Sequence, residues 1–148
     1  MYLTRITYCS ELAGVDKEAI SDILEISRTN NAKASISGML LFNGTYFLQC
    51  LEGSRSAVND TYQRIMRDAR HSRPVLLAYE EIAQRDFGDW NMAYVPWTAE
   101  IRGIIRSFSI SDEFNPYTLS GQSAIGLFRA LRGRLPSSDH WVKPLVQE

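Results

Sequence analysis

The sequence predicts an α+β fold, a ferredoxin-like sandwich built on a five-stranded mixed sheet. Apolar residues alternate at a spacing of two in some segments and recur at a spacing of three to four in others, which separates strands from helices. These segments are ordered strand, helix, strand, strand, helix, strand, strand, with two helical segments behind them. Because strand–helix–strand crossovers are right-handed, the first two helices should share one face of the sheet, and the C-terminal helices should cover the other.

The strands are predicted from their β-branched and aromatic composition and from turn residues at their ends. They are residues 1–9, 36–42, 46–52, 74–83 and 90–96. Asn43-Gly44, between the second and third strands, is a strong hairpin signal.

The helices are predicted from apolar stripes and from capping residues. They are residues 16–30 with Asp16 as N-cap, 53–70, a segment that begins at Thr98, and 122–132. The third helix carries Ile101, Ile104 and Ile105 at helical spacing. This stripe either covers the bare face of the sheet or forms a subunit interface.

Composition sets limits on the class of protein. The chain of 148 residues has the usual size of one domain, and its 45% hydrophobic content is ordinary for a globular protein. It has no run of ~20 apolar residues and no signal-peptide pattern, so we expect no membrane span and a cytoplasmic location. A net charge of −1 gives no electrostatic footprint for nucleic acid. Two cysteines do not suggest a disulfide framework.

Gln49 is the polar residue whose position is hardest to explain by packing. It shares a strand face with Phe47 and Leu51, because side chains alternate along a strand. A buried amide costs free energy unless it is hydrogen-bonded. Tyr8 is expected on the same face of a neighbouring strand. Gln49 therefore needs a buried partner, which is either another side chain or a ligand.

Other polar residues collect at one end of the two-helix layer. They are Asn30, Asn31, Arg64, Asp68, Arg70 and His71. Three ordinary interpretations stand beside a ligand site: a helix C-cap for the two asparagines, an exposed ion pair between Arg64 and Asp68, and a core tyrosine for Tyr8. Taken with Gln49, these polar residues favour a ligand site.

Ile23 and Ile65 lie near the middle of the inward faces of the two helices, where they could flank a flat ring system. A planar, amide-like heterocycle between the helices would need apolar residues on its faces and amide groups at its edge. Core packing explains the two isoleucines equally well.

Other chemistry is poorly supported. The glycine-rich phosphate-binding motifs are absent, and His71 and His140 lack metal-ligand spacing, so no metal site is expected. Cys9 and Cys50 lie on the strand face opposite Gln49 and are expected to be buried, inert thiols. The third strand lacks the basic, glycine-containing pattern of an RNA-binding sheet.

The chain resembles the BLUF family, blue-light sensors that use FAD, over about residues 1–97. The resemblance rests on an ordered set of motifs with characteristic spacing. The set comprises Arg5-Ile6-Thr7-Tyr8, Asp22-Ile23-Leu24 with Ser27, Asn30-Asn31, Ser37-Gly38-Met39-Leu40, Phe47-Leu48-Gln49-Cys50-Leu51-Glu52-Gly53, Tyr62-Gln63-Arg64-Ile65-Met66-Arg67-Asp68, Arg70-His71, Phe87 and Trp90-Asn91-Met92.

The resemblance implies that FAD is bound with its isoalloxazine ring between Ile23 and Ile65, with FMN possible in vitro. Asn31 would hydrogen-bond the ring's C4 carbonyl and N3 edge. The implied cofactor-binding residues are Ile23, Ser27, Asn30, Asn31, Phe47, Gln49, Arg64, Ile65, Asp68, Arg70 and His71.

The resemblance also implies the photochemistry. Gln49 would sit between Tyr8 and the flavin, and light would drive an electron and then a proton from Tyr8. Gln49 would rotate or tautomerise, which shifts the flavin absorption to the red. Met92 or Trp90 would lie next to Gln49 and change position. The first strand is expected between the Gln49 strand and the fifth strand.

We therefore expect a non-enzymatic photosensory domain over residues 1–97 and a C-terminal helical cap of the same domain over residues 98–148. Its output would be an interaction with a downstream signalling protein or its own homo-oligomer, without nucleic acid or membrane. The alternatives are a flavin-dependent redox enzyme and a ligand-free interaction module.

Overall fold

The computed structural model describes residues 2–14, 19–111 and 113–135. The strands are β1 (Leu3–Leu12), β2 (Ser37–Phe42), β3 (Tyr46–Ser54), β4 (His71–Ile82) and β5 (Ala93–Val95). The helices are α1 (Ala19–Ala34), α2 (Arg55–Met66), α3 (Ala99–Arg106), the 3-10 helix η1 (Pro116–Thr118) and α4 (Gly121–Arg132). The predicted order of elements is confirmed, whereas Asp16 and His140 lie outside the described residues.

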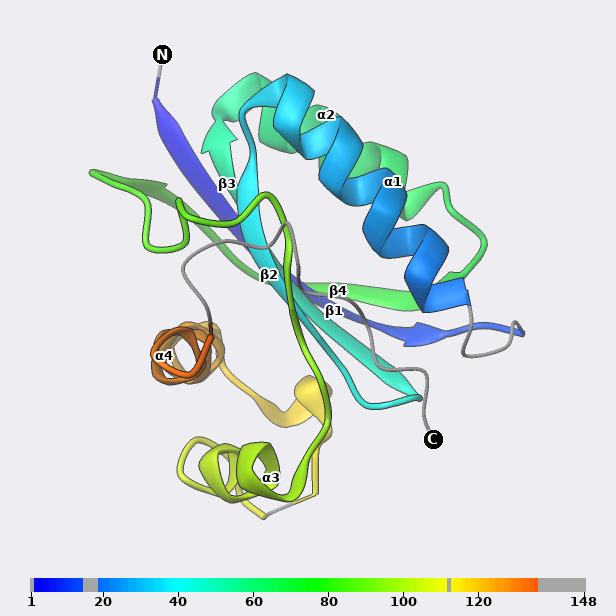
Figure 1. Cartoon of the computed structure of the whole chain (residues 1–148), viewed down its shortest axis with the longest axis vertical. Helices are drawn as coiled ribbons and strands as arrows, with labels where there is room; N and C mark the ends of the chain where they lie inside the picture. The colour runs from blue at the N-terminus through cyan, green and yellow to red at the C-terminus, as the bar shows by residue number, and fades with distance from the viewer. Residues whose placement is uncertain (1, 15–18, 112, 136–148) are drawn as a thin grey trace.

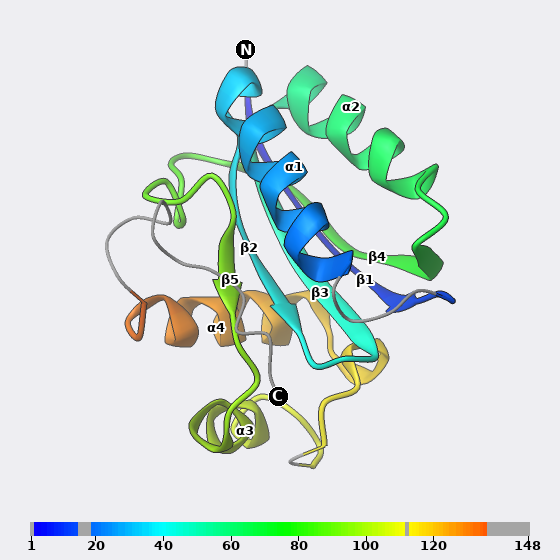
Figure 2. The same ribbon diagram turned by 45° about the vertical axis from the view of Figure 1, so that its right-hand side comes forward.

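The five strands form one mixed sheet in the order β4-β1-β3-β2-β5. The first strand was expected between the third and fifth strands, and this expectation is wrong: β1 lies between β4 and β3. The short β5 instead pairs in parallel with β2 at the other edge, as Figure 2 shows. The segment between β4 and β5 must therefore cross one end of the sheet.

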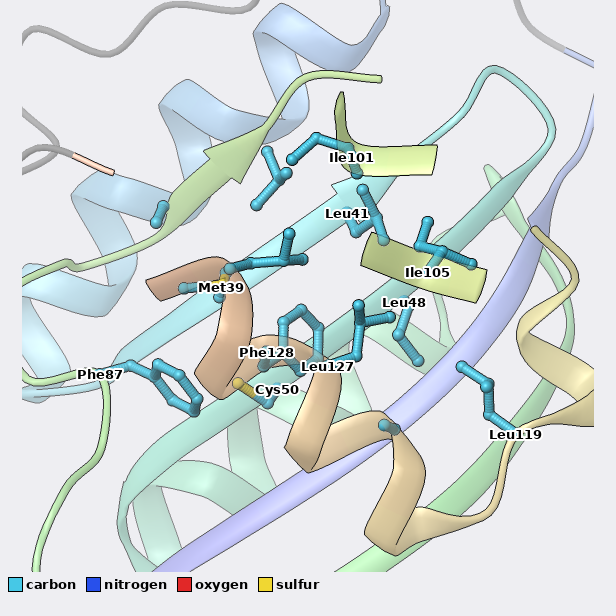
Figure 3. Close-up of a cluster of buried hydrophobic side chains, with 14 of the residues drawn as sticks. Met39, Leu41, Leu48, Cys50, Phe87, Ile101, Ile105, Leu119, Leu127 and Phe128 are labelled. Atoms are coloured by element: carbon cyan, nitrogen blue, oxygen red, sulfur yellow. The ribbon is translucent and has the colours of Figure 1, made fainter. Parts of the chain in front are cut away.

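The two helical layers lie on opposite faces of the sheet (Figure 1). α1 and α2 cover one face, and α3 and α4 cover the other, as the sequence predicted. The stripe of α3 points to the sheet, since Ile101 and Ile105 are buried in the core that α3 and α4 form with it. Figure 3 shows Leu127 and Phe128 of α4 beside them.

Two helix ends differ from the predicted ones. The predicted end of the first helix at Asn30 and Asn31 is wrong, because α1 continues through three more good helix formers to Ala34. It ends where Ser35 takes a left-handed conformation, with φ of 56°. The amides of Ser35 and Ile36 then bond back to the carbonyls of Ala32 and Asn31, which is a Schellman motif. Asn31 is thus fixed in the last turns of α1.

The second helix is shorter than predicted and ends at Met66. Asp68 and Arg70 therefore lie in the turn before β4, and His71 is the first residue of that strand. The amide of Asp68 bonds to the carbonyl of Ile65, so the chain turns sharply there. The polar side chains of Asp68, Arg70 and His71 therefore come from this turn and from β4, at one end of the space between α1 and α2.

Candidate ligand cleft and Gln49 cluster

A cleft opens between α1, α2 and the strands below them, and it gathers the predicted site residues. All eleven residues that the resemblance assigned to the cofactor line it. The cleft is also lined by four residues that were not predicted: Ile26, Leu40, Leu51 and Thr61. The first and last of these follow from helical spacing, since Ile26 lies three residues after Ile23 and Thr61 lies four residues before Ile65.

The cleft has apolar sides and a polar rim. Ile23 is on the α1 side and Ile65 is on the α2 side, while Phe47 and Leu51 rise from β3 beneath them. The amides of Asn30, Asn31 and Gln49 and the charged groups of residues 64, 68 and 70 supply the polar part. This donor set fits a flat, mostly apolar ring that carries carbonyl and N–H groups at one edge.

Tyr8 and Gln49 are directly opposite one another in the β1–β3 ladder. The Tyr8 hydroxyl donates to Gln49 Oε1, and Gln49 Nε2 donates to the Met92 sulfur at 3.3 Å. Gln49 is only 4% exposed, so the predicted need for a buried partner is met by side chains. A thioether is a weak acceptor, however, and the amide still has a second N–H. Gln49 therefore keeps donor capacity toward the cleft that it lines.

The Tyr8 phenol is fully buried, and its burial raises the pKa of this group well above its usual value. The neighbouring Tyr62 and Asp68 raise the pKa further. Tyr8 therefore stays protonated over the whole physiological range. The acceptor that its proton contacts is Gln49 Oε1.

Side chains of α1 hold the backbone that carries Met92. Asn31 Nδ2 donates to the Asn91 carbonyl at 2.8 Å, and Arg28 Nε donates to the Met92 carbonyl at 2.9 Å. Arg28 was not among the predicted site residues. It lies three residues before Asn31, on the same helix face, and this spacing could have indicated it. The cleft and the segment before β5 are thus joined through α1.

The charged end of the cleft is organised by Asp68 and Arg70. Arg70 Nε and Nη2 bind the Asp68 carboxylate at 3.0 and 2.6 Å, and this pairing lowers the pKa of Asp68 to about 2. Asp68 therefore pairs with Arg70, and not with Arg64 as the ordinary interpretation of the sequence suggested. Burial lowers the pKa of His71 to about 4, so its imidazole is neutral and hydrogen-bonds Ser10 Oγ through Nδ1 at 2.7 Å.

Trp90 is not brought to this cluster. It is buried in the α3/α4-side core, while Met92 lies in the α1/α2-side core with Tyr8. Gly38 explains how closely Met92 approaches the sheet. A Cβ at this position would lie 2.2 Å from the Cys50 carbonyl and 3.1 Å from Met92 Cε, so only glycine fits.

The two thiols are on the far side of the sheet, as predicted. Burial raises the pKa of Cys9 to about 11 and that of Cys50 well above its usual value. Both are free and fully buried. Within the described part of the chain, no group of His, Cys, Asp and Glu is arranged to hold a metal ion.

A ferredoxin-like sandwich whose two-helix layer holds a cleft with apolar sides and an amide edge has the features of a ligand-binding α+β domain. Comparison with known proteins identifies its kind. Residues 3–93 match the family of sensors of blue-light using FAD, BLUF. This match covers more than half of the chain, and the chain belongs to the BLUF family.

Curated relatives of several kinds share this region. The blue light- and temperature-regulated antirepressor BluF of Escherichia coli (strain K12) is 33% identical over 91 residues, which are 61% of this chain and 23% of that protein. Photoactivated adenylate cyclase subunit alpha of Euglena gracilis is 29% identical over 93 residues, 61% of this chain and 9% of that protein. The match thus spans less than a quarter of these relatives' length.

Solved structures confirm the predicted fold class. The dark state of BlrB, a BLUF protein, matches with a TM-score of 0.74 at 31% identity, covering 90% of this chain and 98% of that one. The ground state of BlsA matches with a TM-score of 0.79 at 27% identity, covering 87% of each chain. In the residues described, no helix combines the length and apolarity that crossing a membrane requires.

Proposed function

We propose that this chain is a blue-light photoreceptor that binds FAD non-covalently in the cleft between α1 and α2. The observation that carries the proposal is the pairing of Tyr8 with Gln49 beneath a cleft that all eleven expected cofactor residues line. Ile23 and Ile65 would hold the two faces of the ring. Asn31 and Gln49 would hold its polar edge, with residues 64, 68 and 70 around them.

When bound, the flavin supplies an excited state that is a strong oxidant. Tyr8 is the electron donor in this proposal, because it is a buried phenol directly behind Gln49. An oxidised phenol is a strong acid, so its proton passes to Gln49 Oε1. Gln49 then rotates or tautomerises and gives up its weak bond to the Met92 sulfur. Its amide donates more strongly into the cleft, and the return of electron and proton to Tyr8 leaves that arrangement in place.

The size of this signal limits what it can move. One net hydrogen bond is worth ~1 kcal/mol, which shifts a two-state equilibrium about fivefold. The element that responds must therefore already be nearly balanced. Met92 fits this requirement, because the hydrogen bond that its sulfur accepts from Gln49 is weak.

Residues 1–97 form the photosensory part in this proposal, and residues 98–148 form a helical cap of the same domain. The output is an interaction with a downstream signalling protein or with a second copy of the chain. Support comes from the relatives, whose names attach related sequences to an adenylate cyclase and to an antirepressor.

The proposal is tested by absorption spectra of the purified protein, incubated with FAD and then freed of unbound FAD, before, during and after blue light. A reversible red shift without bleaching is expected. A protein that stays colourless, or one that turns over a reductant in the dark, contradicts the proposal. The second outcome would favour a flavin-dependent redox enzyme.

Two variants test the roles of the paired residues. Tyr8→Phe should keep flavin but lose the photocycle, and Gln49→Leu should stay yellow without a red shift. Tyr62→Phe is the matched control, because its ring packs edge-on to Tyr8 at 5.5 Å but lies outside the bond to Gln49. A normal red shift in Gln49→Leu would refute the mechanism.

A further inference from the structure

The segment between β4 and β5, residues 83–92, contacts both the Gln49 cluster and α4. At its end, Met92 receives the Gln49 bond in the α1/α2-side core. Near its start, Asp86 and Phe87 contact α4 on the opposite face of the sheet. We call this segment the 83–92 connection. It joins the two faces that the sheet otherwise separates.

The middle of the 83–92 connection is anchored on the buried carboxylate of Glu52. The exposed fraction of Glu52 is 0%. Its Oε1 accepts from the Phe87 amide at 3.0 Å and the Ser37 hydroxyl at 3.1 Å. Its Oε2 accepts from the Asp86 amide at 2.9 Å and Arg5 Nη1 at 3.2 Å. Removing these donors would leave a buried charge unpaired, so this anchor stays fixed.

The Asp86 side chain makes the contrasting contacts with α4, which lie nearer the surface. Its carboxylate binds the buried Arg5 at 2.6 Å, and on α4 it binds Arg129 at 3.0 Å and Arg132 at 3.2 Å. Arg132 also donates to the Asp86 carbonyl at 2.9 Å. Both α4 arginines are exposed, with side-chain exposures of 49% and 41%. Ion pairs of this kind exchange readily with water.

We propose that Asp86 is a positioning residue that couples the Gln49–Met92 contact to α4 through its ion pairs with Arg129 and Arg132. The inference deepens the proposed function and rests on it. When Gln49 releases Met92, the 83–92 connection shifts about its fixed anchor at Glu52. The contacts of Asp86 with Arg129 and Arg132 are the ones that change, because they are comparable in strength to one net hydrogen bond.

The competing routes to α4 are apolar. Phe87 packs edge-on against Phe128 with ring centroids 6.0 Å apart, and strand residues such as Leu48 pack in the same core. These contacts are fully buried, so a small signal is expected to leave them in place. The experiment must therefore separate the Asp86 route from packing.

The first measurement is hydrogen exchange of α4 amides in the FAD-loaded chain, in the dark and under blue light. In the wild type we expect an exchange change of about fivefold, the equilibrium shift that one net hydrogen bond supports. Asp86→Asn should keep the red shift and lose most of the α4 change. Asp89→Asn is the matched control, since it removes one negative charge from the exposed part of the same connection and should behave like the wild type.

A second measurement needs no light. Met92→Ala removes the acceptor of Gln49 Nε2 and should alter α4 exchange in the dark. The same change in an Asp86→Asn background, or with Arg129→Gln and Arg132→Gln together, should have little further effect on α4. Additive effects would overturn the inference, as would a normal light response of α4 in Asp86→Asn. Loss of the red shift in the wild type would instead refute the proposed function. The comparison of single and double variants in the dark would still decide whether Asp86 couples Met92 to α4.

Discussion

The two faces of the sheet bury side chains in different ways. On the α3/α4 side, fully buried Leu48, Leu127 and Phe128 form a continuous apolar core. The charged residues on that side, such as Glu52, have strong donors on each oxygen. On the α1/α2 side, the core is interrupted by a cleft, and the buried Gln49 donates to a weak thioether acceptor.

This difference separates stability from responsiveness. A face whose charged groups have strong partners has one deep arrangement, and altering it costs several kcal/mol. A face whose buried amide has a weak partner can hold two arrangements of similar free energy. Under the proposed function the two helical layers have different roles: α3 and α4 stabilise the sheet, while α1 and α2 leave room for a ligand and a switch.

The largest effect that would sharpen this contrast is expected from truncating one aliphatic side chain on each face. Leu127→Ala should lower the free energy of unfolding by about 3 kcal/mol, because it leaves a cavity in the closed core. Ile65 lines the cleft and is only partly buried, so Ile65→Ala should lower the free energy of unfolding by less than about half as much. Urea denaturation of both variants without flavin measures the difference. Equal losses would mean that the cleft side is packed as tightly as the other.

The next effect concerns the pH dependence of stability through His71. In the folded chain its pKa is about 4, below the usual 6.5, because burial disfavours the charged form. Below pH 6.5 the unfolded chain binds a proton that the folded chain does not, so stability falls until the pH reaches about 4. Between pH 7.5 and pH 5 the loss should be about 2 kcal/mol.

The variant His71→Gln isolates this contribution, since glutamine can still hydrogen-bond Ser10 and does not titrate. Its unfolding free energy should vary less between those two pH values than that of the wild type. Asp68 does not confuse the comparison, because Arg70 lowers the pKa of Asp68 to about 2, below this window. Identical pH profiles for the two proteins would show that His71 is not buried as a neutral group.

The contrast between the faces also explains what the sequence could predict. Strand and helix periodicity indicated the element order, and alternation along a strand placed Tyr8 and Gln49 on one face and Cys50 on the other. The same alternation would have shown Arg5 and Glu52 as charged residues on the apolar α3/α4 face, directly opposite one another. The pair was not predicted, because Arg5 and Glu52 were each considered only as part of a longer motif.

The remaining errors have physical causes outside local pattern. β5 has three residues, and nothing in so short a strand specifies which edge it joins, so its place beside β2 was not predictable. The end of α1 depends on Ser35, which takes a left-handed conformation that glycine or asparagine usually supplies. The position of Asn31 within the helix, and hence its bond to the segment before β5, follows from that end.

A smaller effect is expected from Asn31→Ala on the cleft side. The change removes the hydrogen bond to the Asn91 carbonyl and, under the proposed function, one contact with the flavin edge. We expect FAD to bind about five- to tenfold more weakly, as for the loss of about one hydrogen bond. Titration of the flavin-free protein with FAD measures this. Asn59→Ala is the control, since Asn59 on α2 is not part of the cleft lining and donates a hydrogen bond to the Tyr79 hydroxyl at 3.5 Å. Unchanged binding in Asn31→Ala would remove Asn31 from the site.

The smallest effect should be seen at the thiols of the closed face. Cys9 and Cys50 are fully buried, and burial raises the pKa of both, so neither accessibility nor thiolate supports reaction. A thiol reagent should label the folded chain only through global unfolding, and the labelling rate should rise with urea as steeply as the unfolding constant does. A rate independent of urea would reveal local opening on the α3/α4 side. That result would break the contrast between a closed face and a responsive one, because both faces would then open at low cost.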